Sequence, residues 1–133
     1  MNANMIIDNE YATLCYYPEH KIIHHTFHKP IGGQPFRDVL MTGLQTMKEN
    51  KANKWLSDDR ANQALPPEDS TWGTDVWFPQ VQAAGWKYWA LVVPESIMGR
   101  LNMKEFVESY SEKGIRIMVF TDPDKALKWL IEA

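Results

Sequence analysis

The sequence predicts an α/β fold with a mixed β-sheet: an N-terminal antiparallel hairpin, then alternating helices and parallel strands, in the order ββαβαβαβα. Three observations support this prediction. Two runs rich in β-branched and aromatic residues lie close together near the start of the chain. Apolar residues then recur at three- and four-residue steps, the period of an amphipathic helix. Short apolar runs and helical segments alternate in the rest of the chain, which is typical of parallel strands joined by right-handed crossovers.

The hairpin is expected from residues 11–17 and 21–27, which are separated by Pro18, Glu19 and His20. Proline fixes φ at a value that suits a turn, so this spacing favours two antiparallel strands. The helix that follows is expected to run from Phe36 to about Asn50. Its apolar stripe consists of Phe36, Val39, Leu40, Leu44 and Met47.

Residues 53–57 predict a short strand that leads into Asp58, Asp59 and Arg60. A helix is expected over residues 67–85, opened by two prolines. Pro79 inside it should kink or split the helix, because the proline ring leaves the carbonyl of Asp75 without its donor. Residues 87–93 form a continuous apolar run, typical of a strand buried on both faces.

The last three elements have clear boundaries. Asn102, with Glu105 three residues on, predicts a capping box at the start of a helix that Gly114 ends. Residues 115–120 predict a strand. Asp122 as the N-cap and proline at the next position predict the start of the final helix.

Composition narrows the class of protein. The chain has 133 residues, of which 44% are hydrophobic, and a net charge of -3. We expect one domain spanning residues 1–133. The mild acidity argues against nucleic-acid binding and against a polybasic membrane patch. No apolar run approaches the roughly 20 residues of a membrane span, and no secretory signal is visible. Cys15 is the only cysteine, which favours a reducing, cytoplasmic location.

Several segments together resemble a known family. The chain is similar to the SpoIIAA-like group, bacterial STAS/SEC14-type relatives of the STAS domain of anti-sigma-factor antagonists. The matching segments are Lys-Trp-Leu-Ser-Asp-Asp-Arg at residues 54–60, Trp-Phe-Pro at 77–79, Val-Val-Pro-Glu at 92–95 and Gly-Arg-Leu-Asn at 99–102. The resemblance covers residues 11–130 and implies a STAS-like fold. It brings no catalytic residues.

The STAS resemblance raises the question of a phosphorylation switch. Regulatory STAS domains resemble one another in a serine, usually in the order Asp-Ser, that opens the helix after a central strand and is phosphorylated. Here the order is reversed, with Ser57 before Asp58 and Asp59, and a longer loop follows. Ser70, near the start of the next helix, is a second candidate. Ordinary helix capping is the alternative explanation for a hydroxyl at that position.

Other side chains that could provide chemistry give weaker patterns. His24 and His28 would share one face of a strand about 13 Å apart, with His25 on the other, so we expect solvent-facing histidines on an edge strand and no metal site. Gly32 and Gly33 lack the context of a phosphate-binding loop, so no nucleotide cofactor is expected. Cys15 has no identifiable base, and no nucleophilic triad is visible.

The candidate binding residues fall into two groups. Asp58, Asp59 and Arg60 follow the carboxyl end of a strand, where ligands of open α/β sheets bind. Turn chemistry is the favoured explanation, in which one aspartate caps a turn and Arg60 neutralises the other. Trp72 and Trp77 lie on a helix that is apolar over a wide arc. Such a helix is either deeply buried or shared between the sheet and a partner surface.

Three functions are considered, in the order in which the sequence favours them. The first is a non-enzymatic interaction module that binds a protein partner or itself, as a homodimer through the aromatic helix. The second is a domain that binds a small apolar ligand or lipid, between helix 67–85 and the loop 94–102 that carries Ile97, Met98 and Leu101. The third is an enzyme that uses Asp58 or Asp59 with Arg60. A flat apolar patch would favour the first, and an enclosed pocket of roughly 300 Å³ or more would favour the second.

Overall fold

The structure, a computed structural model, describes residues 2–62 and 64–133. The elements are β1 (Asn4–Asp8), β2 (Ala12–Tyr17), β3 (Ile22–Phe27), α1 (Gly33–Asn50), β4 (Lys54–Asp58), α2 (Pro67–Trp72), the π-helix η1 (Gly73–Trp77), α3 (Phe78–Ala83), β5 (Tyr88–Val92), α4 (Glu95–Met98), α5 (Met103–Ser111), β6 (Arg116–Phe120) and α6 (Pro123–Glu132). The strands of this described part form one six-stranded sheet in the order β1-β2-β3-β4-β5-β6. Pairing is antiparallel from β1 to β3 and parallel from β3 to β6. The expected mixed α/β sheet is confirmed, and its topology is compatible with a STAS-like fold.

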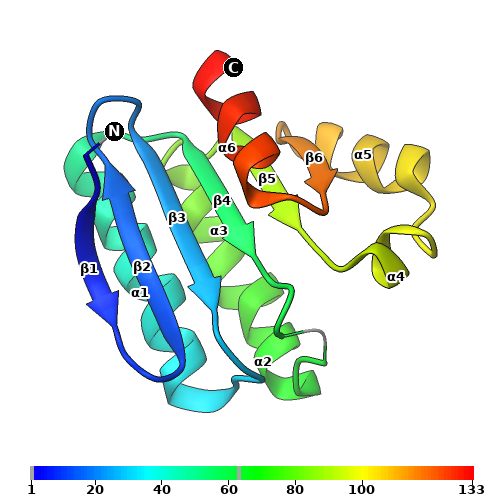
Figure 1. Cartoon of the computed structure of the whole chain (residues 1–133), viewed down its shortest axis with the longest axis horizontal. Helices are drawn as coiled ribbons and strands as arrows, with labels where there is room; N and C mark the ends of the chain where they lie inside the picture. Colours follow the sequence, from blue (N-terminus) through cyan, green and yellow to red (C-terminus); the bar gives the residue numbers. More distant parts are fainter. Residues whose placement is uncertain (1, 63) are drawn as a thin grey trace.

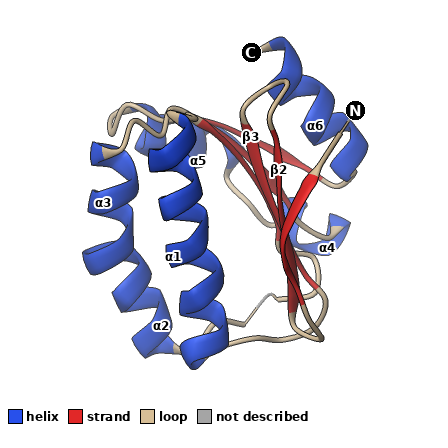
Figure 2. Cartoon of the chain, turned by 90° about the vertical axis from the view of Figure 1, so that its left-hand side faces the viewer, coloured by secondary structure: helices blue, strands red, loops and turns tan. Residues whose placement is uncertain are grey.

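The sheet has an unequal covering on its two faces (Figures 1 and 2). Figure 2 shows α1, α5 and the rod formed by α2, η1 and α3 on one face, and α6 on the other. α6 packs on β4, β5 and β6. β4, β5 and β6 are added one after another at the same edge of the sheet. With right-handed crossovers, the helices that connect these strands all lie on one face. The last helix, α6, follows the last strand and covers the opposite face.

Two elements differ from the order expected from the sequence. The short helix α4 was not expected, and neither was β1. β1 is an edge strand with mostly exposed side chains, among them Met5 at 57% and Ile6 at 41% exposure. It forms because its backbone groups pair with those of β2. Backbone pairing does not require alternating polar and apolar side chains, so the sequence carries no strand pattern here.

The remaining elements are the expected ones, with small shifts at their ends: α1 begins at Gly33 instead of Phe36, and β4 includes Asp58. The whole predicted stripe of α1 is buried, with exposures between 0% and 6%. The side chain of Asn102 accepts a hydrogen bond from the backbone N–H of Glu105, and that of Asp122 accepts one from Asp124. These contacts confirm both predicted caps.

Pro79 alters the helix around it as expected. The rod changes to π-helix over η1, where the N–H of Phe78 bonds to the carbonyl of Gly73, five residues back. It then continues as α3. Pro79 has no N–H to donate to the carbonyl of Asp75. Just before it, the hydrogen bonds span five residues instead of four, and the helix continues without a break.

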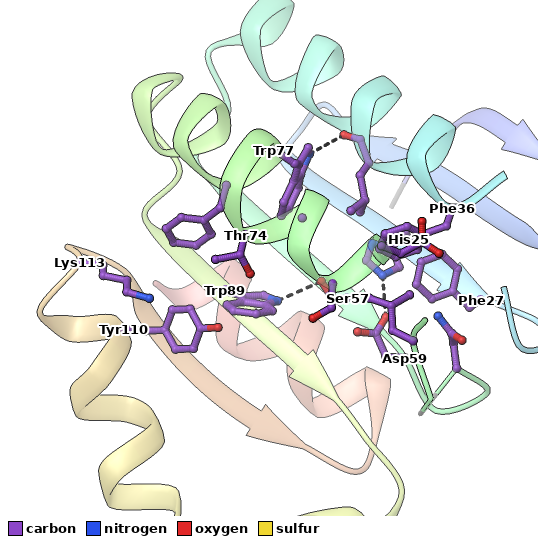
Figure 3. Close-up of a pocket in the computed structure, with 17 residues that line it drawn as sticks. His25, Phe27, Phe36, Ser57, Asp59, Thr74, Trp77, Trp89, Tyr110 and Lys113 are labelled. Atoms are coloured by element: carbon purple, nitrogen blue, oxygen red, sulfur yellow. Dashed lines mark hydrogen bonds and ion pairs between the residues drawn. The ribbon is translucent and has the colours of Figure 1, made fainter. Parts of the chain in front are cut away.

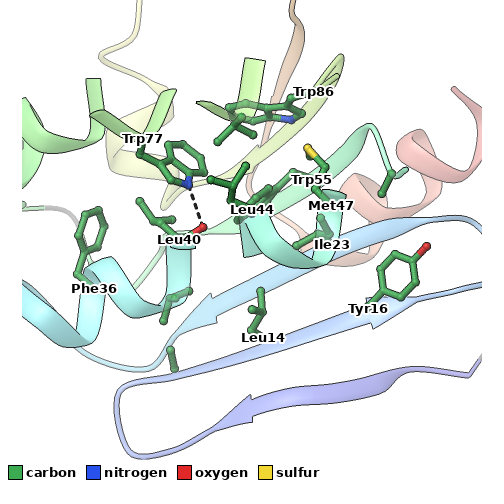
Figure 4. Close-up of a cluster of buried hydrophobic side chains, with 14 of the residues drawn as sticks. Leu14, Tyr16, Ile23, Phe36, Leu40, Leu44, Met47, Trp55, Trp77 and Trp86 are labelled. Atoms are coloured by element: carbon green, nitrogen blue, oxygen red, sulfur yellow. Dashed lines mark hydrogen bonds between the residues drawn. The ribbon is translucent and has the colours of Figure 1, made fainter. Parts of the chain in front are cut away.

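The main core lies between the sheet and the helices on the face of α1 (Figure 4). Trp55 of β4 is completely buried and lies against Trp77 of η1 and Trp86, with ring centroids 5.3 and 5.9 Å away. A second, smaller core joins α6 to the other face through Leu56, Ala90 and Leu130. No helix among the described residues is long and apolar enough to cross a membrane.

Candidate functional site

A cavity of about 300 Å³ lies between the sheet and the α2–η1–α3 rod (Figure 3). Side chains of the sheet, the rod and α5 line it, among them His25, Ser57, Thr74, Trp77, Trp89 and Tyr110. Its volume falls at the lower end of the range of small-molecule sites. Ile97, Met98 and Leu101, which were expected to line a pocket, are not among the residues that line this cavity. Tyr110 of α5 and Lys113, just after this helix, line it instead.

A chain of hydrogen bonds leads from the core to one end of this cavity. The indole N–H of Trp55 donates to Nδ1 of His25 over 2.9 Å. Nε2 of His25 lies 2.8 Å from Oδ1 of Asp59. An indole nitrogen can only donate, so Nδ1 is the acceptor and the ring proton sits on Nε2, which donates to the carboxylate. His25 thus acts as a neutral support that fixes the direction of Asp59.

The two neighbouring aspartates serve different faces of the sheet. Asp59 lines the cavity, and its side chain is 30% exposed. Asp58 points to the opposite face and is buried, where Nε and Nη2 of Arg60 hold its two oxygens at 2.9 and 2.8 Å. The expected trio of Asp58, Asp59 and Arg60 is therefore divided, and its two carboxylates do not form an acid–base pair across one site.

The two candidate phosphorylation sites have unequal access. Ser57 lies in the sheet-side wall of the cavity with 5% exposure, and its Oγ accepts the indole N–H of Trp89 over 2.9 Å. Ser70 is exposed on α2 and also lines the cavity. The Ser57 hydroxyl keeps its own proton free to donate into the cavity.

The two tryptophans named from the sequence also separate. Trp77 is buried and lines the cavity, and its Nε1 donates to the carbonyl of Leu40 over 2.8 Å. Trp72 is half-buried outside the cavity, under the guanidinium of Arg37 at 5.1 Å. Trp77 therefore belongs to the core and the cavity together.

A buried carboxylate at the far wall was missed from the sequence. Asp69, with 1% exposure, accepts the N–H of Gly33 at 2.8 Å and the Nε–H of Arg37 at 3.2 Å. These bonds join the start of α1 to α2. Because Arg37 balances its charge, Asp69 fixes the position of the rod over the sheet.

The histidine expectation is wrong in two respects. β3 lies inside the sheet between β2 and β4, and His25 is buried at 3% exposure. The sequence did contain a signal for this: Ile23 and Phe27, two residues to either side, are apolar and must share a face with His25. His24 is half-buried on the opposite face and His28 is exposed. Among the described residues, no three His, Cys, Asp or Glu side chains are grouped to hold a metal ion.

Burial changes the ionisation of two groups near this region. It raises the pKa of the Tyr110 hydroxyl, which therefore stays protonated and can donate a hydrogen bond in the cavity. On the opposite face, burial and the nearby His25 lower the pKa of His24 to about 4, against a smaller opposing effect of Asp58.

The low pKa of His24 predicts an acid-sensitive fold. Between pH 6.5, the ordinary pKa, and about 4, the unfolded chain takes up a proton at this site and the folded chain does not. The free energy of unfolding should therefore fall on acidification through this window, by at most about 3 kcal/mol. Urea unfolding curves of the wild type and His24→Gln, measured from pH 7.5 to 4, check this.

The variant should lose this component of the pH dependence, whereas His28→Gln, at an exposed position, should keep it. Equal pH slopes for the wild type and His24→Gln would contradict the assignment.

Comparisons of the chain with protein-family models, with curated proteins and with solved structures found no match. Its α/β fold is therefore assigned from its own sheet topology.

Proposed function

We propose that this chain binds a small, amphipathic organic molecule in the cavity between the sheet and the α2–η1–α3 rod. The observation that supports this is the cavity itself: about 300 Å³, with aromatic walls and Asp59 held at one end. Its volume meets the size expected of the ligand-binding alternative, and sites of this kind are mostly apolar with a few fixed polar groups. We further propose that the chain is a SpoIIAA-like, STAS-type domain of the cytoplasm, which its sheet order and its single, buried cysteine support.

A binding role fits the polar groups better than catalysis does. Both ring nitrogens of His25 are engaged, one by Trp55 and one by Asp59. His25 therefore has no free nitrogen to accept a proton from the Ser57 hydroxyl, as a general base must. Asp59 and Ser57 instead offer an acceptor and a donor to a bound molecule.

A variant that fills the cavity tests the proposal. Thr74 is exposed and lines the cavity, so Thr74→Trp should fill the space without disturbing the core. A library of small aromatic compounds, screened by backbone amide chemical shifts, should yield compounds that shift residues of the cavity in the wild type. These shifts should disappear in Thr74→Trp.

Val76→Trp is the matched control, because Val76 is 45% exposed on the same rod and is not among the lining residues. It should bind like the wild type. Compounds that still bind to a folded Thr74→Trp variant at the wild-type level would exclude this cavity as the binding site.

A protein-interaction module remains the second candidate, supported by the two edges of the sheet. β1 exposes Met5 and Ile6, and β6 exposes Met118 at 42%. Exposed apolar residues on unpaired edges are suited to strand addition by a partner. Native mass spectrometry distinguishes the two candidates, since a dimer would favour this one and a retained small molecule the first.

A further inference from the structure

The two carboxylates among the described residues that line the cavity have different partners. Of the two carboxylates that line it, Asp69 is paired with Arg37. Asp59 is hydrogen-bonded to His25, whose neutral ring stabilises the carboxylate without cancelling its charge. The nearest arginine in sequence, Arg60, holds Asp58 on the other face of the sheet. Asp59 is only partly exposed, and in a mostly apolar cavity its charge attracts a cation more strongly than it would in bulk water.

The cavity's only described cationic side chain lies at the opposite end. Figure 3 shows Lys113 on the far side of the cavity from Asp59, with Trp89 between them. Its ammonium lies over the rings of Tyr110 and Phe78, 5.1 and 5.4 Å from their centroids. The two ends of the cavity therefore differ in sign, and a ligand's positive group is directed towards Asp59.

The walls between these ends also suit a cation. Six aromatic side chains line the cavity: Phe27, Phe36, Trp77, Phe78, Trp89 and Tyr110. The faces of aromatic rings carry negative potential and attract ammonium groups, and the same rings pack well against an apolar body. A carboxylate combined with aromatic walls is the chemistry by which proteins recognise organic cations.

We propose that the cavity takes a small organic monocation, an amine or ammonium on an aromatic or apolar body, with its charged group on Asp59. This inference rests on the proposed function and names the class of ligand. The Ser57 hydroxyl oxygen accepts the indole N–H of Trp89 with one lone pair, and its second lone pair can accept an N–H of the bound cation.

Three probes of matched size test the charge preference: 2-phenylethylamine, which is protonated at pH 7, the neutral 2-phenylethanol and the anionic phenylacetate. Each is titrated into the full chain, and backbone amide shifts of the cavity residues give the dissociation constant. The amine should bind about tenfold tighter than the alcohol. A hydrogen bond between two charged groups is stronger than one that involves a neutral group, by an energy that corresponds to about this ratio of dissociation constants. Phenylacetate should bind most weakly.

Asp59→Asn separates charge from shape. The amide oxygen still accepts the Nε2–H of His25, so the fold and the cavity remain. In this variant the amine should bind no tighter than the alcohol, whose affinity stays near the wild-type value. Asp8→Asn removes the same charge from an exposed position on β1 and should leave the order of the three probes unchanged.

The outcomes distinguish the two levels of the proposal. If the three probes bind the wild type equally well, or if Asp59→Asn keeps the preference for the amine, the cation inference is overturned and the cavity remains a binding site. If none of them shifts the cavity residues, the cation inference and the proposed function both fail.

Discussion

Gly43→Ala is expected to destabilise the protein by about 3 kcal/mol, at the upper end of what overpacking a core causes. Gly43 is the point where α1 passes over the ring of Trp55, and a Cβ there would lie 2.1 Å from Cη2 and 2.7 Å from Cζ2. Trp55 is fully buried between Trp77 and Trp86 and tied to His25, so it has no room to withdraw. Thermal unfolding should show a melting temperature lower by roughly 10 °C.

Gly73→Ala is the matched control, since Gly73 is helical and a Cβ there meets nothing within 4 Å. It should be neutral or slightly stabilising. A double-mutant cycle with Trp55→Phe locates the clash: Gly43→Ala should be much less damaging in that background, because phenylalanine lacks the ring atoms it strikes. A full loss in both backgrounds would show that the contact with Trp55 is not the cause.

Trp77→Ala should lower the free energy of unfolding by about 3–5 kcal/mol, the usual loss on truncating a buried aromatic residue. The indole of Trp77 packs edge-on against Trp55 and Trp86, with centroids 5.3 and 5.5 Å away (Figure 4). Its removal also takes away the hydrogen bond from the indole N–H to the carbonyl of Leu40. Denaturant unfolding followed by far-UV circular dichroism measures the loss.

Trp72→Ala is the companion variant, from the same rod. Trp72 is half-buried, and its ring contacts Arg37 and Phe36. Its truncation should therefore lower the free energy of unfolding by only about 1–2 kcal/mol. Losses of equal size for the two tryptophans would contradict the placement of Trp77 in the core and of Trp72 at its border.

Regular packing explains which elements the sequence could predict. In α1 the stripe from Phe36 to Met47 faces one uniform surface, so its period of three and four residues appears directly in the sequence. β1 has no such surface. Its exposed Met5 and Ile6 follow neither the strand nor the helix period, and the strand exists only because β2 offers an edge to pair with.

The candidate site was less accessible to prediction, because it depends on contacts between distant residues. The sequence singled out Asp59, yet its partner His25 lies 34 residues earlier, and only the parallel pairing of β3 with β4 brings the two strands together. The division of Asp58 from Asp59 does follow from strand alternation. The cavity does not, since its size depends on how far Asp69 and Arg37 hold the rod from the sheet.

The strand order has a consequence for how this chain reaches its fold. Each strand pairs with the strand that precedes it in the sequence, so no strand has to insert between two that are already joined. During synthesis, the strand formed last is the edge of the growing sheet. The next strand to leave the ribosome is the one that pairs with this edge. Partners that arrive in order keep loop closures short, which favours rapid folding for a sheet protein. A partly synthesised chain therefore has one unpaired strand edge that awaits the next strand.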